Sequence, residues 1–319
     1  MTNILQNIPL IDCHQDLLAH LRYRDVYKQN QQTDYAMLQK HNVICTVATA
    51  FPIPENEAWF HASANTLIER DLIDYQSHCA CIPSWSITTG AESFNTLQNG
   101  LLLHIEGLNV FTGTPEDWAR LDRWYTLGLR SVGIVWNLTN SLGGGTKDAT
   151  SRLTPLGKSV LQYLERKHMI IDFAHMNEPT FWDAADATQG PIYVSHANAQ
   201  ALCNSPRNLN DHQLRAIAQR DGSVGVMFAN RFICADRKAT IADVANHIEH
   251  MLNIMGPRHV HLGTDLGGII SGTIDGLDTV AGIPDLFAEL QRRNIPEATL
   301  IAIAHSNATR ALSAMLSPL

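Results

Sequence analysis

Short apolar runs alternate with segments of helical periodicity along almost the whole chain. The runs are nearly continuous in hydrophobicity, which is typical of parallel strands buried on both faces. We predict eight such strands, at Ile8–Cys13, Ile44–Phe51, Leu101–Ile105, Arg130–Trp136, Met169–Ala174, Ile192–Ser195, Ser223–Ala229 and His259–Gly263.

The intervening segments carry helix signals. Glu57–Ser77 and Thr240–Met255 fit connecting helices, and in the second of these the apolar residues fall on one face at helical spacing. Capping residues followed by proline or aspartate mark three helix starts, namely Thr114-Pro115, Thr154-Pro155 and Asn210-Asp211. Two further helices are expected after the last strand, at Pro284–Arg293 and Pro296–Met315.

Eight strands that alternate with helices predict a (β/α)8 TIM barrel with additional C-terminal helices. No internal repeat and no low-complexity linker interrupts the pattern, so we expect one domain over residues 1–319. A doubly wound open sheet is the alternative. It is disfavoured because no Gly-rich phosphate turn follows the first strand.

Composition and net charge limit the kinds of molecule that this protein is expected to bind. Hydrophobic residues make up 45% of the 319 residues and charged residues 17%, which is enough for a sizeable core. A net charge of −8 without a Lys/Arg-rich run argues against nucleic acid or a membrane surface and favours a small-molecule substrate. The six scattered cysteines and the absence of signal-peptide features in residues 1–11 lead us to expect a cytoplasmic protein with reduced thiols.

Residue types that commonly bind metals stand at the carboxyl ends of several predicted strands. His14 and Asp16 end the first strand, Glu106 the third, His175 the fifth and His196 the sixth. In a barrel the carboxyl ends of the strands form the active site. Two carboxylates and three imidazoles suit a pair of divalent ions such as Zn²⁺, with one carboxylate shared. Each residue alone would more often be structural, but together they predict a binuclear metal centre.

Seven short motifs follow one another along the chain: Asp12-Cys13-His14-Gln15-Asp16, Ile105-Glu106-Gly107, Asp172-Phe173-Ala174-His175, Ser195-His196, Arg207-Asn208, Gly263-Thr264-Asp265 and Asn307-Ala308-Thr309-Arg310. In these motifs the chain resembles the renal (membrane) dipeptidase family of zinc peptidases, part of the amidohydrolase group of barrels. The resemblance covers essentially the whole chain.

The resemblance implies a role for each motif residue. His14, Asp16 and Glu106 would hold one zinc, and Glu106, His175 and His196 the other, so that Glu106 bridges the two metals. A hydroxide between the metals would attack the peptide carbonyl, and Asp265 would carry its proton to the leaving amine. Arg207 would bind the terminal carboxylate of the substrate, for which a guanidinium is well suited. The resemblance also implies a homodimer.

The chain departs from the family at the end of the fourth strand. Many members have a histidine there that contacts the substrate carbonyl, whereas this chain has Trp136. An indole N–H donates one hydrogen bond and carries no charge. Asn137 could supply a replacement donor, although its side chain should point away from that of Trp136. Trp136 is expected either to contact the substrate or to cap the core. The following loop, 137–152, is expected to be a lid or a solvent-exposed insertion.

We therefore predict a zinc-dependent dipeptidase. Because the family that it resembles also hydrolyses dipeptides with a C-terminal D-residue, the resemblance adds such dipeptides to the candidate substrates. One alternative is a related binuclear-metal amidohydrolase that acts on N-acyl amino acids or another small amide. Another is a barrel that binds metal or ligand without catalysis. Cys13 lies on the first strand beside the ligands, but its side chain should point away from those of His14 and Asp16 and pack in the core, so we do not expect it to bind metal.

Overall fold

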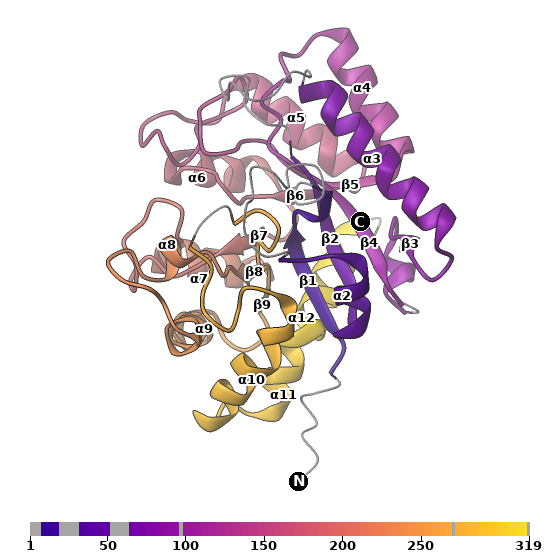
Figure 1. Cartoon of the computed structure of the whole chain (residues 1–319). Coiled ribbons are helices and arrows are strands. Elements are labelled where there is room, and N and C mark those ends of the chain that lie inside the picture. Colours follow the sequence, from indigo (N-terminus) through magenta and orange to yellow (C-terminus); the bar gives the residue numbers. More distant parts are fainter. Residues whose placement is uncertain (1–7, 19–31, 52–63, 96–97, 270–271, 318–319) are drawn as a thin grey trace. The chain divides into compact units, whose positions relative to one another are not determined.

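The computed structural model describes residues 8–18, 32–51, 64–95, 98–269 and 272–317, which fall into two compact units (Figure 1). Unit 1 comprises Met1–Thr46 and Val194–Ala311, and unit 2 comprises Val47–Tyr193 and Leu312–Leu319. The chain passes between the units within three elements: β2 (Val43–Ala50), β7 (Tyr193–Ala197) and α12 (Asn307–Leu316).

The strands of unit 1 are β1 (Leu10–Gln15), the first part of β2, most of β7, β8 (Ser223–Val226) and β9 (Val260–Leu262). They pair in the order β2-β1-β9-β8-β7. The register sets Asp12 opposite Leu262 and Gly225 opposite His261 in parallel pairs. Every residue of β1, β8 and β9 is buried, which explains why these strands are continuous apolar runs.

The strands of unit 2 are the second part of β2, β3 (Ser86–Ile87), β4 (Gly100–Glu106), β5 (Leu129–Gly133) and β6 (Ile170–Asp172). β4 pairs with β2, β3 and β5, and β5 pairs with β6. Asp172 of β6 lies opposite Tyr193, the first residue of β7. The strand order over the whole chain is that of a (β/α)8 barrel with the two-residue β3 added, so the predicted fold class is confirmed.

Several strands end earlier than their apolar runs. β5 ends at Gly133 where the sequence predicts Trp136, β6 at Asp172 where it predicts Ala174, and β8 at Val226 where it predicts Ala229. The residues beyond these ends, such as Phe173 and Phe228, are still buried. Hydrophobicity reports burial, so it cannot separate a strand from the buried start of the loop that follows.

The helices begin where their capping residues indicate. Unit 2 contains α3 (Ala64–Cys81), a 3-10 turn (Ala91–Asn95), α4 (Pro115–Thr126), α5 (Pro155–Arg166) and α6 (Glu178–Ala187). Thr114 forms a capping box with Asp117, and Thr154 accepts from Gly157 N. The predicted helix Glu57–Ser77 corresponds to α3, and its residues 57–63 lie outside the described residues.

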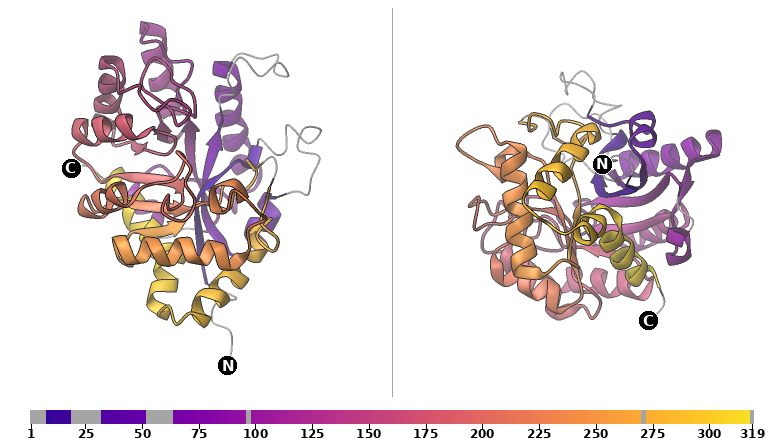
Figure 2. Two further views of the ribbon diagram at one scale, coloured as in Figure 1. Left: turned by 90° about the vertical axis from the view of Figure 1, so that its left-hand side faces the viewer. Right: turned by 90° about the horizontal axis from the view of Figure 1, so that it is seen from below.

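Unit 1 contains α2 (Tyr35–Lys40), α7 (Asp211–Gln219), α8 (Asn230–Ile233), α9 (Ile241–Met255), a 3-10 turn (Val280–Gly282), α10 (Ile283–Arg292), α11 (Glu297–Ile301), a π-turn (Ala302–Ser306) and the start of α12. α9 packs against α7 and α10, and these orange and yellow helices can be followed from two further sides in Figure 2. Within the described ranges, no helix has the length and apolarity needed to cross a membrane.

Candidate metal centre

Unit 1 brings four of the predicted site residues together. The chain after β9 runs beside the end of β1, where Asp265 N donates to His14 O (3.1 Å) and Asp16 N donates to Leu266 O (3.0 Å). Asp265 adopts a left-handed φ of 65°, which is uncommon outside glycine and is held here by this pairing. The side chains of His14, Asp16 and Asp265 therefore share one end of the unit 1 strands.

Asp12, the first residue of the opening motif, has a supporting role. Its buried carboxylate accepts from Thr264 N (2.9 Å), Thr264 Oγ1 (2.5 Å), Gln15 Nε2 (2.6 Å) and His14 N (3.3 Å). These bonds join the ends of β1 and β9, so Asp12 fixes the backbone from which His14 and Asp265 project.

His196 of β7 completes the group. Its ring stacks on that of His14 with the centroids 3.8 Å apart, and both rings are fully or almost fully buried. Ser195 Oγ shares a hydrogen bond of 2.7 Å with His196 Nδ1. Because this bond engages Nδ1, a metal would bind His196 at Nε2.

The ligand atoms of unit 1 converge at a spacing that suits a cation. His14 Nε2 lies 3.7 Å from Asp16 Oδ2 and 3.9 Å from Asp265 Oδ1. One ligand atom each from His14, His196 and Asp265 lies within 4.8 Å of the other two. These separations exceed a hydrogen bond, and ligands bonded to one zinc at ~2.1 Å would be ~3.4 Å apart. Asp16 and the two imidazoles are therefore donor types that fit a divalent metal, and the Asp265 carboxyl lies beside them.

Electrostatics supports the same conclusion. Burial, followed by the charge of Asp265, raises the pKa of Asp16 well above its usual range. Burial also raises the pKa of Asp265 to about 7, against the opposing charges of Arg207 and Arg231. Two neighbouring carboxyls, of which Asp16 is buried and Asp265 is 18% exposed, resist joint ionisation, and a bound cation would remove that resistance.

The residues after Asp265 leave space for these carboxyls. A Cβ on Gly268 would lie 2.2 Å from Asp16 Oδ2 and 2.8 Å from Asp265 Oδ1. Gly267 adopts a φ of 92° and passes close to the Asp16 carbonyl. From the sequence alone, Leu266-Gly267-Gly268 could equally form an ordinary turn. The close approach of these glycines to Asp16 is visible only in the structure.

The Arg207-Asn208 motif divides into two roles. Arg207 is buried, and its charge is the strongest influence that lowers the pKa of Asp265. Asn208 Nδ2 donates to Cys203 O (2.9 Å) and Phe232 O (2.8 Å), which ties the loop after β7 to α8. Asn208 therefore positions the loop that presents Arg207.

Unit 2 holds the remaining predicted ligands, Glu106 and His175. Glu106 is the last residue of β4, and His175 follows β6 with a φ of 65°. His175 Nε2 lies 2.8 Å from Glu106 Oε1, and both side chains are buried. After Glu106 the backbone turns at Gly107, which has a φ of 90°. A Cβ added to Gly107 would lie 2.9 Å from the Cβ of Trp136.

Asn137 orients His175. The carboxamide oxygen of Asn137 lies 2.9 Å from His175 Nδ1 and accepts a second bond from Thr146 Oγ1 (3.0 Å). Because that oxygen can only accept, Nδ1 carries the hydrogen and Nε2 faces Glu106, which is the arrangement of a metal-binding histidine. The sequence suggests Asn137 as a donor to substrate, whereas its oxygen serves as an acceptor for His175.

Trp136 lies beside this pair. Its ring is half-buried, meets Phe51 edge to face at 4.9 Å between centroids, and lies 6.0 Å from the His175 ring. The loop that follows is folded against α6: Gly144 N donates to Thr180 Oγ1 (2.9 Å), and Gly143–Gly145 are buried. Part of the loop is therefore packed, in contrast to a plain solvent-exposed insertion.

A buried pair in unit 2 was not expected from the sequence. His104 Nε2 lies 3.6 Å from Asp172 Oδ2, and His104 Nδ1 shares a hydrogen bond with Ser131 Oγ (2.9 Å). Burial lowers the pKa of His104. Asp172 also accepts from Ala174 N (3.0 Å), so it supports the turn to His175 as Asp12 supports His14.

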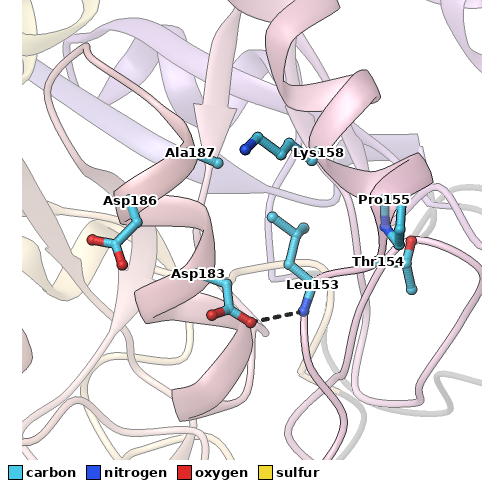
Figure 3. A pocket seen from close by; sticks show the side chains of 7 residues that line it. All are labelled: Leu153, Thr154, Pro155, Lys158, Asp183, Asp186 and Ala187. Carbon is cyan, nitrogen blue, oxygen red and sulfur yellow. Dashed lines mark hydrogen bonds between the residues drawn. The ribbon is translucent and has the colours of Figure 1, made fainter.

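A separate hollow of about 400 Å³ lies between α5 and α6 in unit 2 (Figure 3). Asp183 accepts there from Leu153 N, and Lys158 and Asp186 supply opposite charges. The hollow is lined by Leu153, Thr154, Pro155, Lys158, Asp183, Asp186 and Ala187. None of the predicted site residues is among them.

Comparison with known proteins identifies the family. Residues 1–316 match the family model of membrane dipeptidase, peptidase family M19. An uncharacterised dipeptidase of Schizosaccharomyces pombe is 30% identical, with 96% of this chain and 81% of that protein covered. An uncharacterised Klebsiella pneumoniae protein encoded in the pqqA 5′ region is 38% identical over 66% of this chain and 80% of its own length.

A solved structure of similar fold is a metallopeptidase from Rhodobacter sphaeroides that holds a phosphinate mimic of the dipeptide L-Ala-D-Ala. It superposes with a TM-score of 0.86 at 23% identity and covers 97% of this chain and 99% of its own. The chain thus belongs to the membrane dipeptidase family, peptidase family M19, and its enzyme class is that of a metal-dependent dipeptidase.

Proposed function

We propose that this chain hydrolyses dipeptides with two divalent ions, zinc being the ion that the ligand types suit best. The ligands would be His14, Asp16, Glu106, His175 and His196, with Glu106 shared. The convergence of His14, Asp16, His196 and Asp265 in unit 1 carries this proposal, and the Glu106–His175 pair in unit 2 supports it. When bound, such ions polarise the scissile carbonyl and favour ionisation of water.

Asp265 is proposed as the proton carrier. A general acid–base group works best when its pKa lies near the working pH, and burial raises the pKa of Asp265 to about 7. The carboxylate would take the proton of the attacking water and pass it to the leaving amine. Its position beside His14 supports this role.

Arg207 and Trp136 are proposed to bind the substrate. Arg207 would take the terminal carboxylate, because it is buried near Asp265 and a guanidinium can bind a carboxylate at two points. Trp136 would border the substrate beside His175. The L-Ala-D-Ala mimic bound by the Rhodobacter sphaeroides protein supports dipeptides with a C-terminal D-residue as substrates.

Metal analysis of the purified protein, assayed in parallel on L-L and L-D dipeptides, tests the proposal. We expect about two zinc ions per chain and hydrolysis that chelator abolishes. Two metals with turnover of N-acyl amino acids alone would favour the related amidohydrolase activity, for which Trp136 in place of histidine is the motivating feature. Protein that binds no divalent metal would overturn the proposal.

Location and assembly are also proposals. All six cysteines lie in the described part of the chain and none forms a disulfide there, which supports a reducing compartment such as the cytoplasm. Membership of the family is the ground for a homodimer. Sedimentation of the purified protein would test the dimer, and a monomer at micromolar concentration would contradict it.

A further inference from the structure

The loop that follows β5 contains a strained residue. Asn137 has a φ of 37° and lies at the centre of a three-residue turn in which Leu138 N donates to Trp136 O. A residue other than glycine keeps such a backbone only where its surroundings hold it. Two contacts hold Asn137, because Lys147 N donates to its carbonyl (2.7 Å) and Thr146 Oγ1 donates to its side-chain oxygen (3.0 Å).

Residues 143–148, which we call the support segment, pair with the chain just beyond the proposed metal ligand of β6. Gly145 forms an antiparallel bridge with Met176, and Asn177 N donates to Gly144 O (3.0 Å). The support segment therefore contacts both the strained turn and the backbone that follows the metal ligand.

Glycine at two positions allows this close approach. A Cβ on Gly144 would lie 2.3 Å from Asn177 Nδ2, and a Cβ on Gly145 would lie 2.5 Å from the carbonyl carbon and oxygen of Asn137. Neither glycine has a positive φ. Space, and not backbone conformation, is therefore the reason for glycine at both positions.

Asp148 closes the support segment at its other end. Its carboxylate accepts from Thr139 Oγ1 (2.7 Å), Thr150 N (2.9 Å) and Ser151 N (3.2 Å). Its carbonyl accepts from Asn177 Nδ2 (2.6 Å). Hydrogen bonds therefore restrain the support segment at both of its ends.

Thr146 links this support to His175. The Thr146 side chain is buried, and its hydroxyl donates to the same oxygen of Asn137 that lies 2.9 Å from His175 Nδ1. We propose that Thr146 is a positioning residue for the metal site, which holds the Asn137 carboxamide against Nδ1 so that Nε2 is the nitrogen offered to a metal. This inference rests on the proposed role of His175 as a ligand.

The chemistry of the amide group shows what the Thr146 bond would prevent. A carboxamide that is free to turn can present its NH₂ group to His175 Nδ1 in place of its oxygen. Nδ1 would then have to accept, and the hydrogen of the neutral ring would move to Nε2. Loss of one hydroxyl should therefore change both the tautomer of His175 and the affinity for metal.

The tautomer can be tested without metal. Thr146→Val removes the hydroxyl at nearly constant size, and Thr146→Ser keeps it. NMR of metal-free protein with ¹⁵N-labelled histidine, at alkaline pH, should show the hydrogen of His175 on Nδ1 in the original protein and in Thr146→Ser. In Thr146→Val we expect both tautomers and exchange of the Nδ1 hydrogen with water about tenfold faster. An unchanged tautomer and exchange rate in Thr146→Val would overturn the inference.

Zinc affinity, measured by competition with a chelator, is the second readout. Thr146→Val should weaken binding about tenfold and Thr146→Ser less than about twofold. Thr139→Val is the matched control, since it removes an exposed hydroxyl of the same loop that donates to Asp148. We expect zinc affinity to be unchanged in this control. An equal loss in Thr139→Val would assign the effect to general stability of the loop and overturn the inference.

Gly145→Ala tests the support segment from its backbone. The added methyl group would displace the carbonyl of Asn137, so this variant should lose the Nδ1 signature of His175 and weaken zinc binding. Gly190→Ala, where the nearest atom would be 3.9 Å away, should retain both. Both properties unchanged in Gly145→Ala would overturn the role of the segment.

Dipeptide kinetics on the same proteins separates this inference from the proposed function. Hydrolysis of dipeptides by the original protein, with neither readout altered in Thr146→Val, would overturn the role of Thr146 alone. Both readouts as expected, in a protein that hydrolyses no dipeptide, would overturn the dipeptidase proposal and support the positioning of His175.

Discussion

The imidazole rings of His14 and His196 stack at 3.8 Å between centroids with an interplanar angle of 29°. Their strands, β1 and β7, are separated by β9 and β8 in the order of unit 1, so the two rings meet across the strand ends and not along a shared edge. The stack places an imidazole nitrogen of each residue near the Asp265 carboxyl. This contact shows how strands that are remote in the order of the sheet bring two imidazoles beside the same carboxyl.

Replacement of the proposed proton carrier should abolish turnover without loss of metal. Asp265→Asn keeps the size of the side chain, but a carboxamide cannot take and return a proton. We expect kcat to fall at least about 100-fold while the metal content is unchanged. Asp275→Asn, at an exposed carboxyl that pairs with Lys238, is the control. Activity preserved in Asp265→Asn would remove Asp265 from proton transfer.

The stability of metal-depleted protein should depend on Asp265. Burial raises its pKa to about 7, so between pH ~4 and ~7 the folded state binds more protons than the unfolded state, whose aspartate titrates near 3.9. The free energy of unfolding should therefore be highest below this window and fall as pH rises through it. Urea denaturation at several pH values measures this, and Asp265→Asn should flatten the profile. An unchanged profile in the variant would assign the effect to other groups.

Gly268 should be essential for metal binding. In Gly268→Ala the new methyl group would lie 2.2 Å from Asp16 Oδ2 and displace that carboxylate. We expect metal affinity to fall about 10- to 100-fold in competition with a chelator. Gly190→Ala is the matched control, since its nearest neighbour would be 3.9 Å away. Equal affinity in the two variants would show that the carboxylate has room to move.

Asn137 should act through His175. Asn137→Gly removes the acceptor without strain at the φ of 37°, and Asn137→Asp retains an acceptor for Nδ1. We expect Asn137→Gly to weaken metal binding about 10-fold or more and Asn137→Asp to restore it. The pair separates orientation from packing, because a purely structural role would give the two variants similar affinities for metal.

Arg207 should discriminate between free and amidated substrates. Arg207→Ala should raise KM for a free dipeptide about 10- to 100-fold and leave turnover of the corresponding dipeptide amide nearly unchanged. Steady-state kinetics on both substrates makes the comparison. Equal losses on the two would mean that Arg207 does not read the terminal carboxylate.

Local patterns in the sequence determined the elements of this protein. Apolar runs located β1, β2 and β4–β9, and the side chains of Thr114, Thr154 and Asn210 marked helix starts because a cap acts only a few residues away. Residues at the carboxyl ends of strands, such as His14 and Glu106, could be proposed as ligands because a barrel sets the carboxyl ends of all its strands on one side.

Only the tertiary structure decided which side chains contact and position one another. Asn137 meets His175 across 38 positions, Gly268 meets Asp16 from the other end of the chain, and Arg231 acts on Asp265 from a different element. Neither member of such a pair carries a local signal, since the contact depends on packing. The left-handed backbone at His175 and Asp265 likewise follows from the hydrogen bonds around each residue and not from the residue type.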